Sequence, residues 1–215
     1  MMVWQLWFEP PGPLPKSGFI DGDFRKVSVA APDPDFSLGF QEGAAAYRFG
    51  APISVHDVPT KLMWETTDPL YDYGTLHGAS CISQRFKDLI ERLEPGVHQY
   101  FPLEVVDKRG AHLADQWIWV PSQRLDSLDR AKTTMVLVYG KIWLYPRDIP
   151  ADELPPGYDP TRPVKAVFSH KQIGISHFWR DKFYNFGCLF CSDEAAAVLA
   201  AADLIGVGLL KQESV

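Results

Sequence analysis

The sequence predicts an α+β fold in which a mixed or antiparallel sheet carries a few packed helices and long loops connect the elements. Three observations indicate this class. Residues 82–94 have the apolar spacing of an amphipathic helix, short β-branched and aromatic segments flank it, and a strand–helix–strand pattern closes the chain. The length, 215 residues, is typical of one compact domain. Within it we distinguish an acidic region of strands and loops, residues 1–76, from an α+β core, residues 77–215.

The first element expected is a strand over Val3–Phe8, where β-branched and aromatic residues dominate. The prolines of residues 10–13 end it, because proline cannot donate a backbone hydrogen bond to a neighbouring strand. From there to residue 80 the pattern favours loops and short strands. In this stretch four apolar residues alternate with polar neighbours: Val27, Val29, Ile53 and Val55.

The clearest helix is expected over residues 82–94. Its apolar residues recur on one face of a 3.6-residue period, and charged residues fill the other face. Ser80 or Ser83 is positioned to cap its N-terminus, and Pro95 and Gly96 end it. The apolar face consists of Ile82, Phe86, Leu89, Ile90 and Leu93.

Strands are expected after this helix. Residues 97–120 read as a hairpin whose turn lies at 107–110, and residues 135–144 read as one strand with a bend at Gly140. Six prolines then make residues 146–163 a long connection without regular structure, which is either functional or a surface excursion without a role. A short strand is expected over residues 165–168.

The end of the chain predicts a compact strand–helix–strand unit. A buried strand is expected over residues 187–191, a helix over 195–204 and a last short strand over 205–209. Ser192 is a natural N-cap for the helix, and Asp193 and Glu194 favour the positive end of the helix dipole.

Composition excludes several function classes. The net charge is −6, from 21 basic and 27 acidic side chains, which argues against a dedicated nucleic-acid-binding protein. We find no apolar run long enough to cross a membrane and no secretory signal, and three cysteines do not make a disulfide framework. These features lead us to expect a soluble, cytoplasmic protein. Residues 1–76 hold ten acidic and five basic side chains, so most of the net charge lies there.

No catalytic, cofactor-binding or metal-binding residues are predicted. Cys188 and Cys191 have the spacing of a redox pair or half a zinc site, but we favour the interpretation that both belong to the core. The six histidines form no metal-binding motif, and we interpret them as scattered surface residues or satisfied core residues. No nucleophile elbow, phosphate-binding loop or dinucleotide fingerprint occurs.

Several stretches resemble the Imm11 family, which comprises immunity proteins of bacterial polymorphic toxin systems. The resemblance covers about residues 80–210 and fades upstream. The sequence departs from the family pattern at residues 119–122, where WVPS replaces an asparagine-containing strand, and the prolines of 146–163 look like an insertion. The stretches that carry the resemblance are SQRFK at 83–87, EPGVHQYFPLEV at 94–105, LDSLD at 125–129, LFCSDE at 189–194 and AADLIGV at 201–207.

This resemblance implies a non-enzymatic protein that binds and neutralises a cognate toxin domain encoded by a neighbouring gene. Acidic side chains on such an inhibitor favour a basic partner, such as a nuclease-type toxin. We therefore predict that two acidic groups contribute to toxin binding. A generic interaction or scaffold protein is the first alternative, and an enzyme with a dispersed active site is the second. The predicted toxin-binding residues are Asp21, Asp23, Asp33, Asp35, Asp148, Asp152, Glu153 and Asp159.

Overall fold

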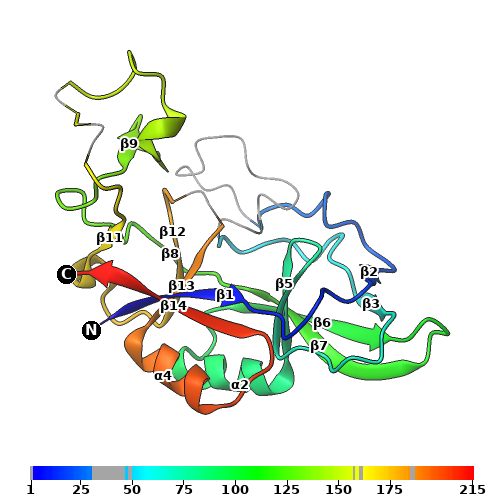
Figure 1. Cartoon of the computed structure of the whole chain (residues 1–215). Helices are drawn as coiled ribbons and strands as arrows, with labels where there is room; N and C mark the ends of the chain where they lie inside the picture. Colours follow the sequence, from blue (N-terminus) through cyan, green and yellow to red (C-terminus); the bar gives the residue numbers. More distant parts are fainter. Residues whose placement is uncertain (1, 31–46, 48–49, 157, 160–161, 185–186) are drawn as a thin grey trace.

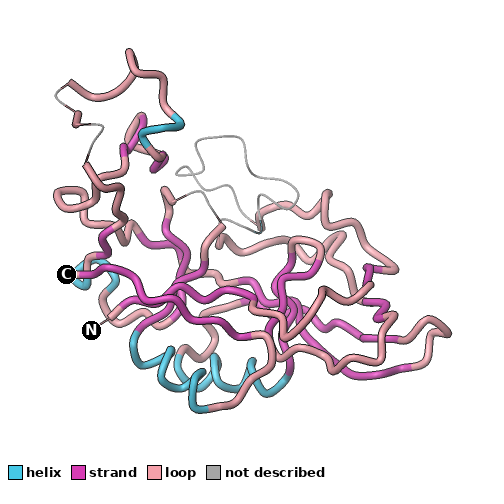
Figure 2. The backbone as a smooth tube through the Cα atoms, viewed as in Figure 1, coloured by secondary structure: helices cyan, strands magenta, loops and turns pink. Residues whose placement is uncertain are grey.

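The protein is built mainly from strands, with its main helices gathered on one face (Figures 1 and 2). A computed structural model describes residues 2–30, 47, 50–156, 158–159, 162–184 and 187–215. Within these ranges the strands form two six-stranded sheets and one two-stranded sheet. Sheets with few helices agree broadly with the predicted α+β class. No helix in the described ranges is both long enough and apolar enough to cross a membrane.

The first sheet joins the two ends of the chain. β1 lies between β14 and β13 and runs antiparallel to both, so that Val3 faces Gln212 on one side and Ser192 on the other. The predicted first strand is therefore confirmed, and it occupies the middle of the sheet. The strand order is β11 (Val167–Phe168), β14 (Val207–Ser214), β1 (Val3–Phe8), β13 (Leu189–Ser192), β12 (Phe178–Asp181) and β8 (Arg124–Leu125).

The second sheet is organised around the predicted hairpin at 97–120. Its two strands pair from Gln99↔Val120 to Val106↔His112, with an irregular register near Val105, which confirms the hairpin. β3 (Lys61–Trp64) pairs with the first hairpin strand, β6, in parallel. β5 (Ala79–Ser83) pairs with the second hairpin strand, β7, in antiparallel orientation. The strand order is β2 (Ser17–Phe19), β3 (Lys61–Trp64), β6 (Gln99–Val106), β7 (His112–Val120), β5 (Ala79–Ser83) and β4 (Tyr73–Leu76).

The single strand predicted for residues 135–144 is wrong. The segment forms two antiparallel strands, β9 (Val136–Val138) and β10 (Ile142–Leu144). The chain reverses at Tyr139 and Gly140, whose φ angles are 51° and 68°. Glycine adopts positive φ at little cost, so Gly140 marks a reversal of direction where the pattern had indicated a bend.

Two helices cover one face of the sheets. α2 (Gln84–Leu93) begins after Ser83, whose hydroxyl accepts a hydrogen bond from the Phe86 amide at 3.1 Å. α4 (Asp193–Ala201) begins after Ser192, whose hydroxyl accepts from the Ala195 amide at 3.1 Å. Both predicted serine caps are confirmed. Two further turns, α3 (His170–Ile173) and the 3-10 helix η1 (Pro146–Asp148), were not predicted.

The helices bury their apolar faces against both sheets. Phe86 and Ile90 of α2 and Leu199 of α4 pack in one cluster with Leu6, Trp119 and Phe178. Trp119 is fully buried, and its ring meets that of Phe178 edge to face at a centroid distance of 5.6 Å. Because Leu6 and Trp119 come from different sheets, this cluster joins the two sheets beneath the helices.

Candidate functional site

The predicted acidic residues lie at two separate places. Asp21 and Asp23 follow β2, whereas the other group belongs to a segment that projects from the body at the other end of the view (Figure 1); this group consists of Asp148, Asp152, Glu153 and Asp159. Asp33 and Asp35 lie outside the described residues. The described acidic residues therefore do not form one continuous patch.

Asp21 holds the loop after β2 against the start of β3. Its Oδ1 accepts the amides of Thr60 (2.9 Å) and Lys61 (2.8 Å), and its Oδ2 accepts the Thr60 hydroxyl at 2.5 Å. Partial burial acts to raise the pKa of Asp21, but the hydrogen bonds from Thr60 and Lys61 outweigh it and lower the pKa. Asp21 thus has a structural role whichever surface binds a partner.

Asp23 is paired within its own loop. Its Oδ1 accepts from Arg25 Nε at 2.9 Å, and Lys26 Nζ lies 3.9 Å from its Oδ2. The hydrogen bond from Arg25 is the main cause that lowers the pKa of Asp23. Two neighbouring cations therefore offset its charge locally.

The second acidic group belongs to a projecting segment, which we call the arm; its described residues are 134–156, 158–159 and 162–165. The two ends of the arm are tied together, since the Thr134 hydroxyl donates to the Pro163 carbonyl and accepts the Lys165 amide, each at 2.7 Å. Trp143 anchors the arm to the core, because its side chain is buried and its amide donates to the Phe183 carbonyl at 2.8 Å. The arm is therefore built on a fixed base.

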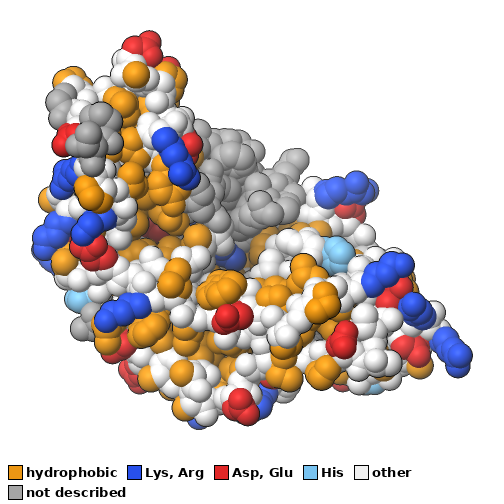
Figure 3. Space-filling view, in the orientation of Figure 1, with side chains coloured by type: hydrophobic (Ala, Val, Ile, Leu, Met, Phe, Trp, Pro, Cys, Tyr) orange, Lys and Arg blue, Asp and Glu red, His pale blue; other side chains and the backbone are white. Residues whose placement is uncertain are grey.

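The outer part of the arm is exposed. Tyr139 is 85% exposed, which is unusual for an aromatic side chain, and Asp148, Asp152 and Glu153 are exposed as well. Figure 3 shows hydrophobic and charged side chains next to one another on this projection. The arm carries four acidic and four basic residues, so its net charge is zero. It combines an aromatic anchor with mixed charge, a composition that suits protein recognition.

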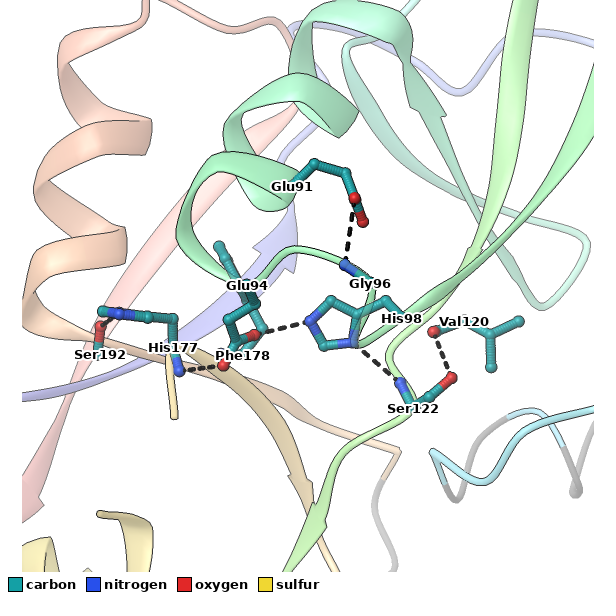
Figure 4. Close-up of polar contacts among 9 residues, drawn as sticks. All are labelled: Glu91, Glu94, Gly96, His98, Val120, Ser122, His177, Phe178 and Ser192. Carbon is teal, nitrogen blue, oxygen red and sulfur yellow. Dashed lines mark hydrogen bonds and ion pairs between the residues drawn. The ribbon is translucent and has the colours of Figure 1, made fainter. Parts of the chain in front are cut away.

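A buried polar network lies where α2 runs into β6 (Figure 4). Glu94 Oε2 lies 2.7 Å from His98 Nε2, and both side chains are almost fully buried. The Ser122 amide donates to His98 Nδ1 at 3.1 Å, so Nδ1 is an acceptor and the proton of the neutral ring belongs on Nε2, which donates to Glu94. This is the geometry of a fixed tautomer.

The same Glu94 carboxylate binds the start of β12. Its Oε1 accepts the His177 amide at 2.5 Å and its Oε2 accepts the Phe178 amide at 3.1 Å. The Gln123 amide, oriented to suit its neighbours, donates to Glu94 Oε1 at 3.2 Å. One carboxylate therefore connects the end of α2 to β6, to the segment after β7 and to β12. Sequence reasoning treated His98 as an isolated residue, although its four-residue spacing from Glu94 was a usable signal.

The Glu94–His98–Ser122 arrangement contains the residue types of a hydrolytic triad but differs from one in geometry. A nucleophilic serine would direct its hydroxyl at the imidazole. Here the backbone amide of Ser122 contacts the ring, while Ser122 Oγ donates to the Val120 carbonyl at 3.0 Å. The arrangement fits a structural role, in which a buried carboxylate and imidazole satisfy backbone amides.

The residues of the LDSLD stretch, 125–129, also have structural roles. The buried Asp181 carboxylate accepts the Ser127 amide at 2.7 Å and the Ser127 hydroxyl at 2.8 Å. Leu128 is fully buried, and Asp129 Oδ1 caps the following turn through the amides of Ala131 and Lys132. This stretch therefore stabilises the fold.

The three cysteines form no disulfide bonds. Cys81 and Cys191 are fully buried, and burial raises the pKa of Cys81 to about 12 and raises that of Cys191 as well. Cys188 is half-buried. The core interpretation is confirmed for Cys191, whereas Cys188 retains some access to solvent. Across the ranges that the structure describes, no three His, Cys, Asp or Glu side chains lie together as metal ligands would.

Together these observations define a sheet-rich α+β protein in which the buried polar groups stabilise the fold and an exposed arm projects from the body. Residues 7–214 match the model of the immunity protein family Imm11, and the chain belongs to this family. The match extends the resemblance upstream of residue 80 and includes the acidic first third. No curated protein matches the chain.

Proposed function

We propose that this protein binds and neutralises a cognate toxin domain encoded by a neighbouring gene, and that the arm is its main contact surface. Family membership supports the immunity role. The arm is supported by one observation above all: Tyr139 is 85% exposed at the end of a hairpin whose base is anchored in the core. This role places the protein in the cytoplasm of the cell that makes the toxin.

An anchored arm suits tight binding for two physical reasons. Exposed tyrosines bury a large area with few rotatable bonds, and they are enriched among the residues that dominate binding energies. A segment already fixed at its base loses less conformational entropy on binding than a free loop does. We therefore propose Tyr139 as the aromatic residue at the centre of the toxin contact. Its charged neighbours on the arm would form the polar rim around that contact.

The charge of the protein favours a basic toxin, such as a nuclease-type domain. The net charge of −6 attracts a basic partner over long range and increases the association rate. Asp152 and Glu153 are exposed neighbours on the arm and are our first choice for direct contacts. Contributions from Asp148 and Asp159, and from Asp21, Asp23, Asp33 and Asp35, stay predictions.

The test combines rescue in cells with binding in solution. Co-expression is expected to protect a cell from the product of the adjacent gene, and the two purified proteins are expected to form a complex. Tyr139→Ala is expected to weaken binding by about tenfold or more, as for a typical aromatic anchor. The double variant Asp152→Asn/Glu153→Gln is expected to slow association, with the largest effect at low ionic strength.

Matched controls come from the β6–β7 hairpin, away from the arm. Leu113 is 46% exposed and the Asp115 side chain is 84% exposed. Leu113→Ala and Asp115→Asn are expected to leave both affinity and association rate unchanged. Failure of rescue by the wild-type protein would contradict the immunity role. Rescue with full affinity in the Tyr139→Ala variant would instead move the contact surface away from the arm.

A further inference from the structure

A cavity of about 200 Å³ lies where the two six-stranded sheets meet, away from the arm. Strands of both sheets line it: Gln5 and Trp7 come from β1, Ser80 from β5 and Arg180 from β12. Trp7 is 44% exposed and marks the solvent side, whereas Arg180 is only 5% exposed and lies in the interior. A water molecule occupies about 30 Å³ of liquid, so the cavity has room for a molecule of several heavy atoms.

Arg180 brings a buried positive charge to this cavity. Its Nη1 donates to the Gly187 carbonyl, and its Cζ lies 5.8 Å from the centre of the Tyr47 ring. Its Nε is buried and finds no hydrogen-bond acceptor in the described part of the chain. Leaving a buried charged donor unpaired is costly, so this geometry indicates that an acceptor from outside belongs here.

The neighbouring acidic groups do not supply that acceptor. Asp181, next to Arg180 in sequence, directs its oxygens to the amides of Ser127, Phe183 and Tyr184. Among the described residues that line the cavity, Arg180 is the only charged one. Its guanidinium therefore makes the described wall electropositive.

Burial favours the neutral forms of the tyrosine and cysteine side chains in the wall. Burial raises the pKa of Tyr47, Tyr73 and Cys188, and the positive charge of Arg180 acts on each in the opposite direction without reversing the shift. The Tyr47 hydroxyl is already used, since it donates to the Trp119 carbonyl and accepts the Ser80 amide, each at 2.6 Å. These contacts fix the wall, in which Nε of Arg180 is a buried donor without an acceptor in the described part of the chain.

We propose that this cavity binds a small carboxylate anion, with the Arg180 guanidinium as its counter-charge. A guanidinium matches the planar geometry of a carboxylate, and one positive charge balances one negative charge. A phosphate group carries a charge nearer −2 and would leave part of it uncompensated in a buried place. Thr75 and Ser80 also line the cavity, and their side chains hydrogen-bond to Tyr73, which keeps this part of the wall polar. This site is independent of the arm and of any toxin.

Cys188 lines the same cavity and provides a chemical reporter. Iodoacetate and iodoacetamide are nearly equal in shape, but only iodoacetate carries a carboxylate. With either reagent the Cys188 thiolate attacks the methylene carbon, a C–S bond forms and iodide leaves. Both reactions use the same thiolate, so the ratio of their rates does not depend on the pKa of Cys188. The ratio therefore measures whether the cavity favours or disfavours a reagent that carries a carboxylate.

We expect the iodoacetate-to-iodoacetamide rate ratio at Cys188 to exceed that of N-acetylcysteine by about tenfold, as befits a hydrogen-bonded charge pair. Peptide mass spectrometry assigns the label to Cys188. Arg180→Gln is expected to lower the ratio to the N-acetylcysteine value or below it, while the exposed Arg147→Gln is expected to leave it unchanged. Sodium propionate is expected to slow labelling of Cys188 relative to sodium chloride at equal ionic strength.

If the Arg180→Gln variant does not fold, the labelling of the wild-type protein alone still tests the proposal. A rate ratio at or below that of N-acetylcysteine overturns it, because a neutral buried cavity would disfavour the charged reagent. Slowing of the labelling by inorganic phosphate but not by propionate also overturns the assignment to a carboxylate. A Cys188 that neither reagent labels in the folded protein shows that the cavity is closed to small molecules, which excludes the site.

Discussion

The carboxylate of Glu94 lies 2.7 Å from the imidazole of His98, with the carboxylate side chain 6% exposed and the imidazole not exposed at all. Glu94 follows the last residue of α2 and His98 precedes β6, so the pair brackets the connection between them. Because Glu94 also accepts the amides of His177 and Phe178, it links the second sheet to β12 of the first. Several backbone groups therefore depend on one side chain.

Glu94→Ala is expected to lower the free energy of unfolding by about 3 kcal/mol. The substitution leaves the His177 and Phe178 amides and the His98 ring without an acceptor in a buried place. Urea denaturation at neutral pH measures the change. Glu153→Ala, at an exposed position of the arm, is the control and should alter stability by less than about 0.5 kcal/mol. Equal effects of the two substitutions would contradict the structural role of Glu94.

Glu94 and His98 are expected to act as one unit. His98→Phe keeps a ring of similar size but removes the donor to Glu94 and the acceptor for the Ser122 amide. In a double-mutant cycle with Glu94→Gln, the double variant should lose less stability than the two single losses added together, by about 1 kcal/mol. Strictly additive losses would mean that the two side chains do not interact in solution.

Asp21 is expected to make stability depend on acid. Its folded pKa is lowered from the ordinary value of 3.8, so its stabilising contribution is complete above that value and is lost as the pH falls below it. Asp21→Asn should therefore be destabilising at pH 7 and should flatten the loss of stability between neutral and strongly acidic pH. Urea titrations over that range provide the measurement. An unchanged acid dependence in Asp21→Asn would show that its hydrogen bonds to Thr60 and Lys61 do not form.

The cysteines should differ in native-state alkylation. Cys81 and Cys191 are fully buried and their pKa values are raised, so iodoacetamide should label them only as fast as the protein unfolds. Cys188 is half-buried and should react first. Time-resolved peptide mass spectrometry distinguishes the three. Rapid labelling of Cys191 in the folded protein would contradict its assignment to the core and would show that its thiol is reactive.

Gly206→Ala should destabilise the protein much more than Gly96→Ala. Both glycines have positive φ angles, 92° and 71°, but a Cβ at Gly206 would come within 2.2 Å of the Tyr73 carbonyl oxygen, whereas a Cβ at Gly96 meets open space. We expect a loss of about 1 kcal/mol at Gly96 from backbone strain alone and at least twice that at Gly206. Thermal or urea unfolding compares them directly. Similar losses would mean that the Tyr73 segment moves aside easily.

Local sequence signals predicted the elements that are determined locally. Ser83 and Ser192 cap helices because a serine precedes an apolar periodic segment, and the 97–120 hairpin follows from two strand patterns around a turn. Elements shaped by distant partners were missed. β8 and β12 are short strands that pair with each other across about 55 residues of sequence, and no local pattern encodes that partnership.

The candidate sites show the same division. The family resemblance rested on stretches such as LDSLD, whose residues bind one another and the core. Charge counting selected Asp21 without indicating that Thr60 and Lys61 occupy its carboxylate. Arg180 drew no attention in the sequence, because its significance lies in burial next to a cavity formed by strands from both sheets.

The position of β1 between β13 and β14 has a consequence for biosynthesis. Its partners emerge from the ribosome long after β1 itself, because they follow it at a large distance in sequence; Trp4, for example, is hydrogen-bonded to Asp193 across 189 residues. β1 must therefore wait, unpaired, until β13 and β14 have been translated. Completion of this sheet is thus a late event, and a nascent chain cut short before Val207 would lack the strand that covers one edge of β1.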